Sequence, residues 1–226
     1  MPPESTLSGR SILLVGGAGG LGSATAKLLE AEDARVIVSS RSHGVCADIT
    51  SRADRERLLD VVPELYGLVV FAGTPARGDS AETIQLSDEV NYHGPILLAR
   101  EAARRMQSAG TQGAIVLFST MQALSIFPGS TAYAGAKAAL LHAALILAKE
   151  CRGAVNIRVN VIAPGVMEAG MALASIASGK YQRYIDDGVI ARYGRAIDVA
   201  RAVRFLLEPD NYITGQVLSV DGGITL

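Results

Sequence analysis

Short apolar runs alternate along this chain with longer stretches in which apolar positions recur every three or four residues. The runs predict strands and the longer stretches predict helices. Most of the expected strands are continuous runs of valine, isoleucine and leucine, as in a parallel sheet covered on both faces. Their alternation with helices from end to end predicts a single-domain, Rossmann-type, doubly wound α/β fold. The expected strands are Ile12–Val15, Arg35–Ser39, Leu68–Phe71, Ala114–Ser119, Asn156–Ile162 and Gln216–Val220.

The pattern is interrupted after the second expected strand. Only residues 42–44 separate Arg41 from the apolar run that begins at Val45, whereas a crossover between parallel strands takes about a dozen residues or more. The sequence therefore predicts that the helix after strand two is missing and that strand three is lost or reduced to a stub. A sheet of about six parallel strands, with a more open pocket beside this edge, would follow.

Length and composition are consistent with one domain over residues 1–226. With 226 residues, of which 49% are hydrophobic, the chain can bury one full core. Its 21 basic and 22 acidic residues leave a net charge of −1, and no basic block favours binding to nucleic acid or to an anionic membrane. The apolar stretch Ala138–Ala148 is expected to be too short to span a bilayer. Met1–Ser5 lacks the layout of a signal peptide.

The cysteines and histidines give no sign of a disulfide or a metal site. Cys46 and Cys151 are the only two cysteines and lie far apart in the sequence. The three histidines have no ligand-like spacing. We therefore expect two reduced thiols, a cytoplasmic location and no metal.

A glycine-rich loop, Gly16–Gly22, follows the first strand, and a helical pattern runs from Ser23 to about Glu32. This order forms the first turn of a dinucleotide-binding unit, in which glycines let the backbone approach a pyrophosphate and the helix N-terminus holds its charge. The alternative is a plain turn. Two registers remain open, one with the GxGxxG spacing and one with GxxxGxG. The first uses Gly17, Gly19 and Gly22, and the second uses Gly16, Gly20 and Gly22.

Tyr133 and Lys137 lie on one face of an expected helix that is rich in alanine and leucine, because their i, i+4 spacing places them one turn apart. A cation close to a phenol favours the phenolate and is expected to lower its pKa from about 10. Tyr133 is therefore a candidate general acid or base. The pair alone is a weak signal and gains weight from the glycine loop upstream.

The glycine loop and the Tyr133/Lys137 pair, in that order, resemble the short-chain dehydrogenase/reductase family. The resemblance covers nearly the whole chain and is strong for fold and cofactor class, but poor for substrate. The further segments that carry it are Asn91 within Glu89–Gly94, Ala114–Thr120, Arg158–Gly165 and Ile213–Gly223.

The resemblance implies a four-residue reaction centre. Tyr133 would exchange a proton with the carbonyl or alcohol oxygen, while Lys137 would hold the nicotinamide ribose and lower the pKa of Tyr133. Asn91 would anchor a water that leads to Lys137; alternatively it is a polar residue at a helix kink. Thr120 stands where the family usually has a serine, and its hydroxyl offers the same donor. Ser119 should point the other way along the strand.

The resemblance also implies where a cofactor would bind. The second strand ends in Ser40 and Arg41 instead of the acidic residue that selects NAD, so NADP(H) is favoured over NAD(H); alternatively Arg41 is a solvated surface charge. Asp48 and Ile49 would contact the adenine. The expected contacts are Gly16, Gly19, Gly20, Leu21, Gly22, Ser40, Arg41, Asp48, Ile49, Ala72, Gly73, Tyr133, Lys137, Pro164, Gly165 and Val166.

Three further residues depart from the family pattern at cofactor contacts, and each removes a side-chain hydrogen bond worth about 0.5–1.5 kcal/mol. They are Val15, Phe71 and Ala169. The expected substrate lid, about 166–190, carries apolar residues such as Met167, Met171, Leu173 and Ile176, although ordinary helix packing explains them equally well. Gln122 and Phe127 are further candidates for the pocket wall.

The sequence thus predicts an NADP(H)-dependent oxidoreductase that interconverts a small, apolar carbonyl compound and its alcohol. The alternative is a cofactor-binding, non-redox relative that is regulatory or acts as a lyase or isomerase. The resemblance also implies a homodimer or homotetramer formed through the helices that carry Asn91 and Tyr133, and the small apolar residues of Ala138–Ala148 are compatible with this.

Overall fold

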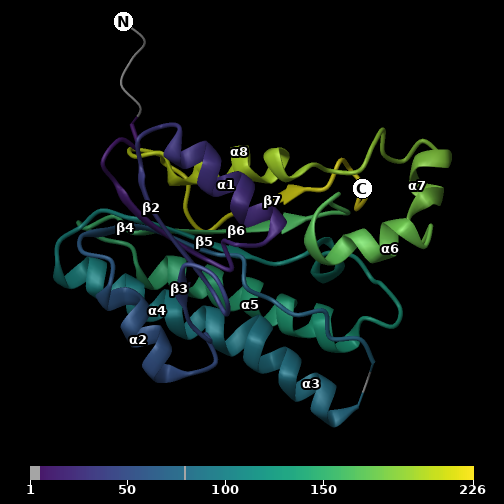
Figure 1. Cartoon of the computed structure of the whole chain (residues 1–226), viewed down its shortest axis with the longest axis horizontal. Coiled ribbons are helices and arrows are strands. Elements are labelled where there is room, and N and C mark those ends of the chain that lie inside the picture. Colours follow the sequence, from purple (N-terminus) through teal and green to yellow (C-terminus); the bar gives the residue numbers. More distant parts are fainter. Residues whose placement is uncertain (1–5, 79) are drawn as a thin grey trace, which may run out of the picture.

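The computed structural model describes residues 6–78 and 80–226. Met1–Ser5, where no signal peptide is expected, and Asp79 lie outside the described residues. A seven-stranded sheet in the order β3-β2-β1-β4-β5-β6-β7 forms the centre, and all neighbouring strands are parallel. The predicted doubly wound α/β fold is confirmed (Figure 1). The strands are β1 (Ser11–Val15), β2 (Arg35–Ser40), β3 (Val45–Cys46), β4 (Leu65–Val70), β5 (Ala114–Phe118), β6 (Arg158–Pro164) and β7 (Val217–Val220).

Helices cover both faces of the sheet. In Figure 1, α1 and α8 lie on one side, and α2, α4 and α5 lie on the other with α3 beside them. Short helices α6 and α7 stand beyond the end of the sheet, in the segment expected to form a lid. The helices are α1 (Gly20–Glu30), α2 (Arg52–Asp60), α3 (Ala81–Asp88), α4 (Gly94–Ser108), α5 (Thr131–Glu150), α6 (Leu173–Ala177), α7 (Gln182–Asp186) and α8 (Ala196–Leu207).

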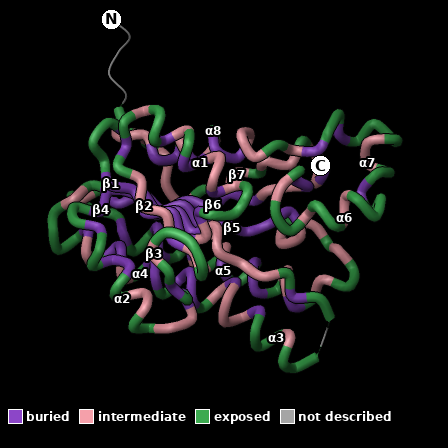
Figure 2. The backbone as a smooth tube through the Cα atoms, viewed as in Figure 1, coloured by how far each residue is buried: buried purple, intermediate pink, exposed green. Residues whose placement is uncertain are grey.

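Alternating side chains of the strands supply two cores. In β1, Leu13 packs toward α2, α4 and α5, whereas Leu14 packs toward α1 and α8, because successive side chains of a strand point to opposite faces. Figure 2 shows the buried residues concentrated along the sheet between the two helix layers. A smaller third core, which includes Met121, Val166 and Tyr181, lies under the α6–α7 segment.

The interruption after β2 is confirmed. Residues 41–44 alone connect β2 to β3, no helix lies between them, and β3 is a two-residue stub paired in parallel with Ser39 and Ser40. Ser40 organises the turn, since its Oγ accepts from the backbone N–H of His43 over 2.8 Å and donates to the carbonyl of His43 over 2.9 Å. Gly44 has a φ of +69°, a conformation that favours glycine. The stub adds a seventh strand to the six full ones.

The ends of two expected elements shift for local reasons. The strand expected from Asn156 begins at Arg158 because Asn156 adopts a φ of +53°. The first helix begins at Gly20, so the last glycines of the loop form its first turn. The turn that holds Asn91 is π-helical over Glu89–His93 and leads directly into α4.

Helix α5 is longer than the stretch Ala138–Ala148 suggested. It runs over 20 residues and, within the described chain, is the one helix long and apolar enough to cross a membrane by length and composition alone. A core helix of an α/β protein passes the same test, and one face of α5, with Leu140, Ala144 and Leu147, packs into the core on the sheet.

Candidate active site

One cavity of about 730 Å³ runs along the carboxyl ends of the strands, where ligands bind in open α/β sheets. It reaches from Arg41 and Asp48, through the glycine loop, to Tyr133. All the residues expected to contact a cofactor line this cavity, and so does Thr120. Gln122 and Phe127 line it as well. Asn91 is not among the lining residues.

The glycine loop is shaped by close backbone contacts. A Cβ on Gly16, whose φ is +77°, would lie 2.7 Å from the backbone N of Ala72, and a Cβ on Gly22 would lie 2.4 Å from Cα of Gly17. One on Gly20 would lie 3.0 Å from Cβ of Ala169, whereas Gly19 has 3.5 Å to its nearest neighbour. A Cβ on Gly17 would lie 2.9 Å from Cβ and the carbonyl oxygen of Leu14, so each of the two registers contains crowded glycines, and Gly19 has the most room. Side chains would fill this cradle, so the residues present fit a dinucleotide pyrophosphate.

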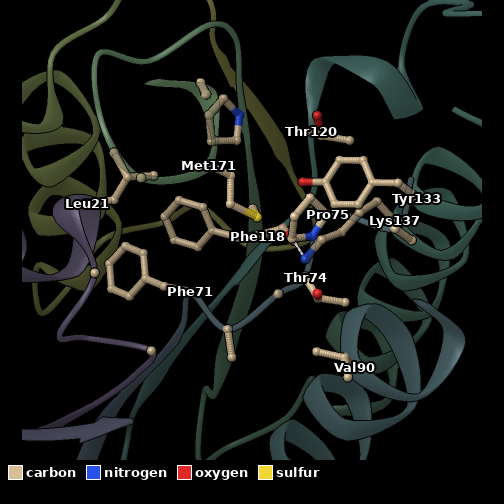
Figure 3. A pocket seen from close by; sticks show the side chains of 18 of the residues that line it. Leu21, Phe71, Thr74, Pro75, Val90, Phe118, Thr120, Tyr133, Lys137 and Met171 are labelled. Carbon is tan, nitrogen blue, oxygen red and sulfur yellow. Dashed lines mark hydrogen bonds between the residues drawn. The ribbon is translucent and has the colours of Figure 1, made fainter. Parts of the chain in front are cut away.

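Tyr133 and Thr120 lie side by side on one side of the cavity, with their hydroxyl groups close together (Figure 3). Thr120 lies two residues beyond the end of β5, where a hydrogen bond from its side chain acts to lower the pKa of Tyr133. Its Oγ1 also accepts from the backbone N–H of Gln122 over 3.3 Å. Ser119 points the other way and donates to the carbonyl of Lys137 over 3.0 Å. Of the two neighbouring hydroxyls, the one on Thr120 is directed toward Tyr133.

Lys137 is buried one turn further along α5. Its Nζ donates to the carbonyl oxygen of Phe118 over 2.8 Å. Burial lowers the pKa of Lys137 to about 8 and raises the pKa of Tyr133 to about 12, an effect that the Thr120 hydrogen bond partly offsets. The expectation that Lys137 lowers the Tyr133 pKa is therefore wrong for this structure, because desolvation of the phenol is the largest effect and Lys137 turns toward a backbone carbonyl.

Asn91 lies behind the cavity wall and is fully buried. Its Oδ1 accepts from the backbone N–H of Thr74 over 2.9 Å, and its Nδ2 donates to the carbonyl of Thr74 over 3.0 Å and to Oγ of Ser87 over 3.0 Å. Gly73 lies against both Asn91 and Lys137: a Cβ there would meet Asn91 Oδ1 at 3.0 Å and Lys137 Nζ at 3.5 Å. Asn91 thus fixes the loop after β4 beside the amine of Lys137.

The adenosine end of the cavity is also organised by side chains. Arg41 is exposed on the turn between β2 and β3 and lines the cavity. The hydroxyl of Ser40 is engaged within that turn. Asp48 Oδ1 accepts from the backbone N–H and the hydroxyl of Thr50, over 2.9 and 2.8 Å, and the neighbouring Ile49 is buried.

The three departures from the family pattern all line the cavity. Phe71 packs against Phe118, with ring centroids 4.5 Å apart and planes 35° from parallel. Figure 3 shows the two rings between Leu21 and the Tyr133–Lys137 side of the cavity, with Met171 above Phe118. This side of the cavity is aromatic and apolar.

Sequence reasoning missed Phe118, Thr74 and Ser87. Phe118 directly precedes Ser119 and Thr120 at the end of a strand, so its position could have predicted that it lines the cavity. Ser87 stands one helical turn before Asn91, an i, i+4 spacing that the expected helix already contained. The contact from Thr74 is made by its backbone and leaves no mark on the sequence.

The lid residues divide between the cavity and the third core. Met167 and Met171 line the cavity. Ile176 packs against the third core, and Leu173 is exposed.

Comparisons with known proteins match the chain over this whole site. A family model described as enoyl-(acyl carrier protein) reductase matches residues 16–225. The carbonyl reductase family member 4 of Danio rerio is 31% identical, over 96% of this chain and 98% of its own length. A 3-oxoacyl-[acyl-carrier-protein] reductase of Thermotoga maritima is 28% identical, over 97% of this chain and 99% of its own.

Solved structures agree with these matches. A short-chain type dehydrogenase/reductase from Mycobacterium ulcerans superposes with a TM-score of 0.88 at 28% identity, covering 97% of this chain and 90% of that one. The structure titled ElxO with NADP bound gives a TM-score of 0.86 at 25% identity, covering 96% and 98%. With a family model over nearly its full length and relatives matched end to end, this chain belongs to the short-chain dehydrogenase/reductase family of oxidoreductases.

Proposed function

We propose that the protein is an NADP(H)-dependent oxidoreductase that interconverts a small, predominantly apolar carbonyl compound and its alcohol. The observation that carries the proposal is the cavity itself. It joins a glycine cradle to a tyrosine hydroxyl that is hydrogen-bonded to Thr120 and flanked by a buried lysine. Carbonyl reductase family member 4, a matched relative, is named for carbonyl reduction.

Each residue of the centre has one role in this proposal. Bound NADPH would supply a hydride to the carbonyl carbon. Tyr133 donates its hydroxyl proton to the carbonyl oxygen, and Thr120 donates a hydrogen bond to the same oxygen. Lys137 holds the nicotinamide ribose by its ammonium group. Asn91 holds the loop at Thr74 in place, and a water next to its turn would connect Lys137 with solvent.

The protonation state of Tyr133 is compatible with its role as a proton donor. Burial raises the pKa of Tyr133 to about 12, so the phenol keeps its proton near neutral pH. The same shift makes the phenol a weaker acid, because a general acid works best when its pKa lies near the operating pH. The raised pKa therefore accounts for a protonated Tyr133 and does not decide the direction of the reaction.

The preference for NADP(H) rests on Arg41. A guanidinium pairs with a phosphate dianion, and the turn after β2 offers this charge at the mouth of the cavity. ElxO, one of the matched structures, is described as having NADP bound.

We also propose a cytoplasmic location and a homodimer or homotetramer. Cys46 and Cys151 are free cysteines, one exposed and one buried. Leu97 on α4 and Ile146 on α5 are each 46% exposed, and these apolar side chains would suit a surface buried between subunits. Size-exclusion chromatography with light scattering tests the oligomer, and Leu97→Glu should shift it toward the monomer.

The test of the proposed function is NADPH oxidation with a panel of ketones, aldehydes, quinones and cyclic diketones, run beside NADH. Tyr133→Phe should bind NADPH, seen by its fluorescence, but lose turnover by at least about two orders of magnitude. Tyr212→Phe changes a fully exposed tyrosine and serves as the matched control. Cofactor binding without turnover of any panel member by the unaltered protein would instead favour the non-redox alternative.

That alternative has one observation in its favour. Val15, Phe71 and Ala169 place apolar groups along the cavity where the family pattern has hydrogen-bonding side chains. A weakened hold on the nicotinamide would leave cofactor binding intact while slowing hydride transfer. The Tyr133→Phe comparison separates the two readings, since the non-redox function does not depend on this hydroxyl.

A further inference from the structure

A buried serine hydroxyl connects the π-helical turn to the helix that carries Tyr133. Ser87, in the last turn of α3, is fully buried. Its Oγ donates to the carbonyl oxygen of Ala132 over 2.9 Å and accepts from Nδ2 of Asn91 over 3.0 Å. Ala132 directly precedes Tyr133 in the first turn of α5.

The donors and acceptors fix the direction of every hydrogen bond in this network. Because Oδ1 of Asn91 accepts from the backbone N–H of Thr74, its Nδ2 must face the Thr74 carbonyl and Ser87. An amide nitrogen can only donate, so Ser87 accepts there and gives its single hydrogen to Ala132. The network from Thr74 to Ala132 therefore has one arrangement, in which each of these buried polar side chains is satisfied.

The network joins three segments that are far apart in the sequence. Thr74 lies on the loop after β4, Ser87 and Asn91 lie where α3 meets the π-helical turn, and Ala132 lies at the start of α5. The first turn of a helix is its least constrained part, since its N–H groups lack intrahelical partners. The N-cap residue of α5, Ser130, directs its hydroxyl to the side chain of Gln122. Through Ala132, Ser87 thus holds the first turn of α5, which carries Tyr133.

We propose that Ser87 is a positioning residue, which holds the Tyr133 turn of α5 in register with Asn91 and the Thr74 loop. The inference rests on the proposed function, because its kinetic consequence requires Tyr133 to be the proton donor. Small displacements of a reacting group are costly to the rate even when binding is unchanged. The hydroxyl of Ser87 is therefore expected to affect the chemical step and not the affinity for the cofactor.

The kinetic test compares Ser87→Ala and Ser87→Cys with the unaltered protein. Loss of one buried hydrogen-bonding group should lower kcat by between about two- and tenfold and leave the KM for NADPH within about twofold. Ser87→Cys keeps a weaker donor, so its kcat should lie between that of Ser87→Ala and that of the unaltered protein. The matched control is Ser39→Ala, a buried hydroxyl in β2 for which no partner is found among the described residues, and it should leave kcat unchanged.

Hydrogen exchange separates this inference from the proposed function, since it needs no turnover. In Ser87→Ala the amides of the first two turns of α5 should exchange faster, while those near Lys149 keep their rates. If the unaltered protein reduces no carbonyl compound, the proposed function fails, and exchange alone decides whether Ser87 holds the turn. Unchanged exchange together with a kcat within twofold of the unaltered protein would overturn the inference. Should Ser87→Ala not fold, Ser87→Cys supports the same comparison.

Discussion

Lys137 donates its ammonium hydrogen to the carbonyl oxygen of Phe118 over 2.8 Å, which ties α5 to the end of β5. The lysine is buried, and the burial lowers its pKa to about 8. The chain therefore keeps a cation in a place where burial opposes the charge. Such an arrangement costs stability, and this cost is common at sites that bind or transform a ligand.

The stability of the protein should rise with pH between about 8 and 10. The pKa of Lys137 is about 8 in the folded chain and about 10.4 in an unfolded one, so in this window the unfolded state binds more protons and a higher pH favours folding. Above about pH 10 the direction reverses. The pKa of Tyr133 is about 12 when folded and about 10 when unfolded, and loss of this proton then favours the unfolded chain. Urea denaturation across this range measures both effects.

Lys137→Met should remove the increase in stability between about pH 8 and 10. It should also stabilise the protein near neutral pH by about 1–3 kcal/mol and abolish turnover. Lys149→Met, which changes an exposed lysine near the other end of α5, is the control and should keep the rise. A rise of unchanged size in Lys137→Met would show that another group is responsible.

The hydroxyl of Thr120 and not that of Ser119 should be needed for turnover. Thr120→Val keeps the shape of the side chain and removes the hydroxyl that hydrogen-bonds to Tyr133, so kcat/KM should fall by about two orders of magnitude or more. Ser119→Ala removes one hydrogen bond to the backbone of Lys137, and its kcat/KM should fall by less than about tenfold. The reverse ranking in steady-state kinetics would reassign the donor to Ser119.

The fold was predictable because its signals are local. Apolar runs marked the six full strands, and the four residues between β2 and β3 excluded a crossover helix whatever their identity. The sequence could not decide whether β3 is lost or kept as a stub. The pairing of the stub with Ser39 depends on hydrogen bonds within the turn and on Gly44.

The candidate site was predictable only where a residue acts by its own chemistry. Tyr133 and Lys137 were found from their types and spacing, and Thr120 from the family resemblance. The pKa values were not predictable, because desolvation depends on what surrounds a group in three dimensions. The hydrogen bonds of Asn91 are made to the backbone of Thr74, which any residue type other than proline would offer. The stack of Phe71 on Phe118 joins two strands and has no sequence signal.

Arg41 should decide the choice of cofactor. Arg41→Ala removes the guanidinium from the turn after β2 and should weaken NADPH binding by about tenfold or more, which is about 1.4 kcal/mol, while NADH binding changes by less than about twofold. Fluorescence titration with both cofactors measures the two affinities. Arg104→Ala, which removes a largely exposed arginine of α4, controls for net charge. Equal losses for both cofactors in Arg41→Ala would make this arginine a general surface charge.

Gly44 should be required for the short connection at the sheet edge. Its φ of +69° disfavours any other residue, and a Cβ would lie 2.0 Å from the carbonyl oxygen of Val38, so Gly44→Ala must displace the turn that carries Arg41. Gly110→Ala is the matched control, since Gly110 has a φ of +64° but no atom within 4 Å of the added Cβ. Backbone strain alone should lower the free energy of unfolding of the control by about 1 kcal/mol. Gly44→Ala should lower it by about 1–3 kcal/mol more.

The same substitution should weaken NADPH binding more than the control does, because the displaced turn presents Arg41 to the cavity. Urea denaturation and NADPH titration of the two variants measure both losses. Equal destabilisation in Gly44→Ala and Gly110→Ala would contradict this prediction. It would mean that the turn can move to accommodate a side chain, although Gly44 lies close to Val38.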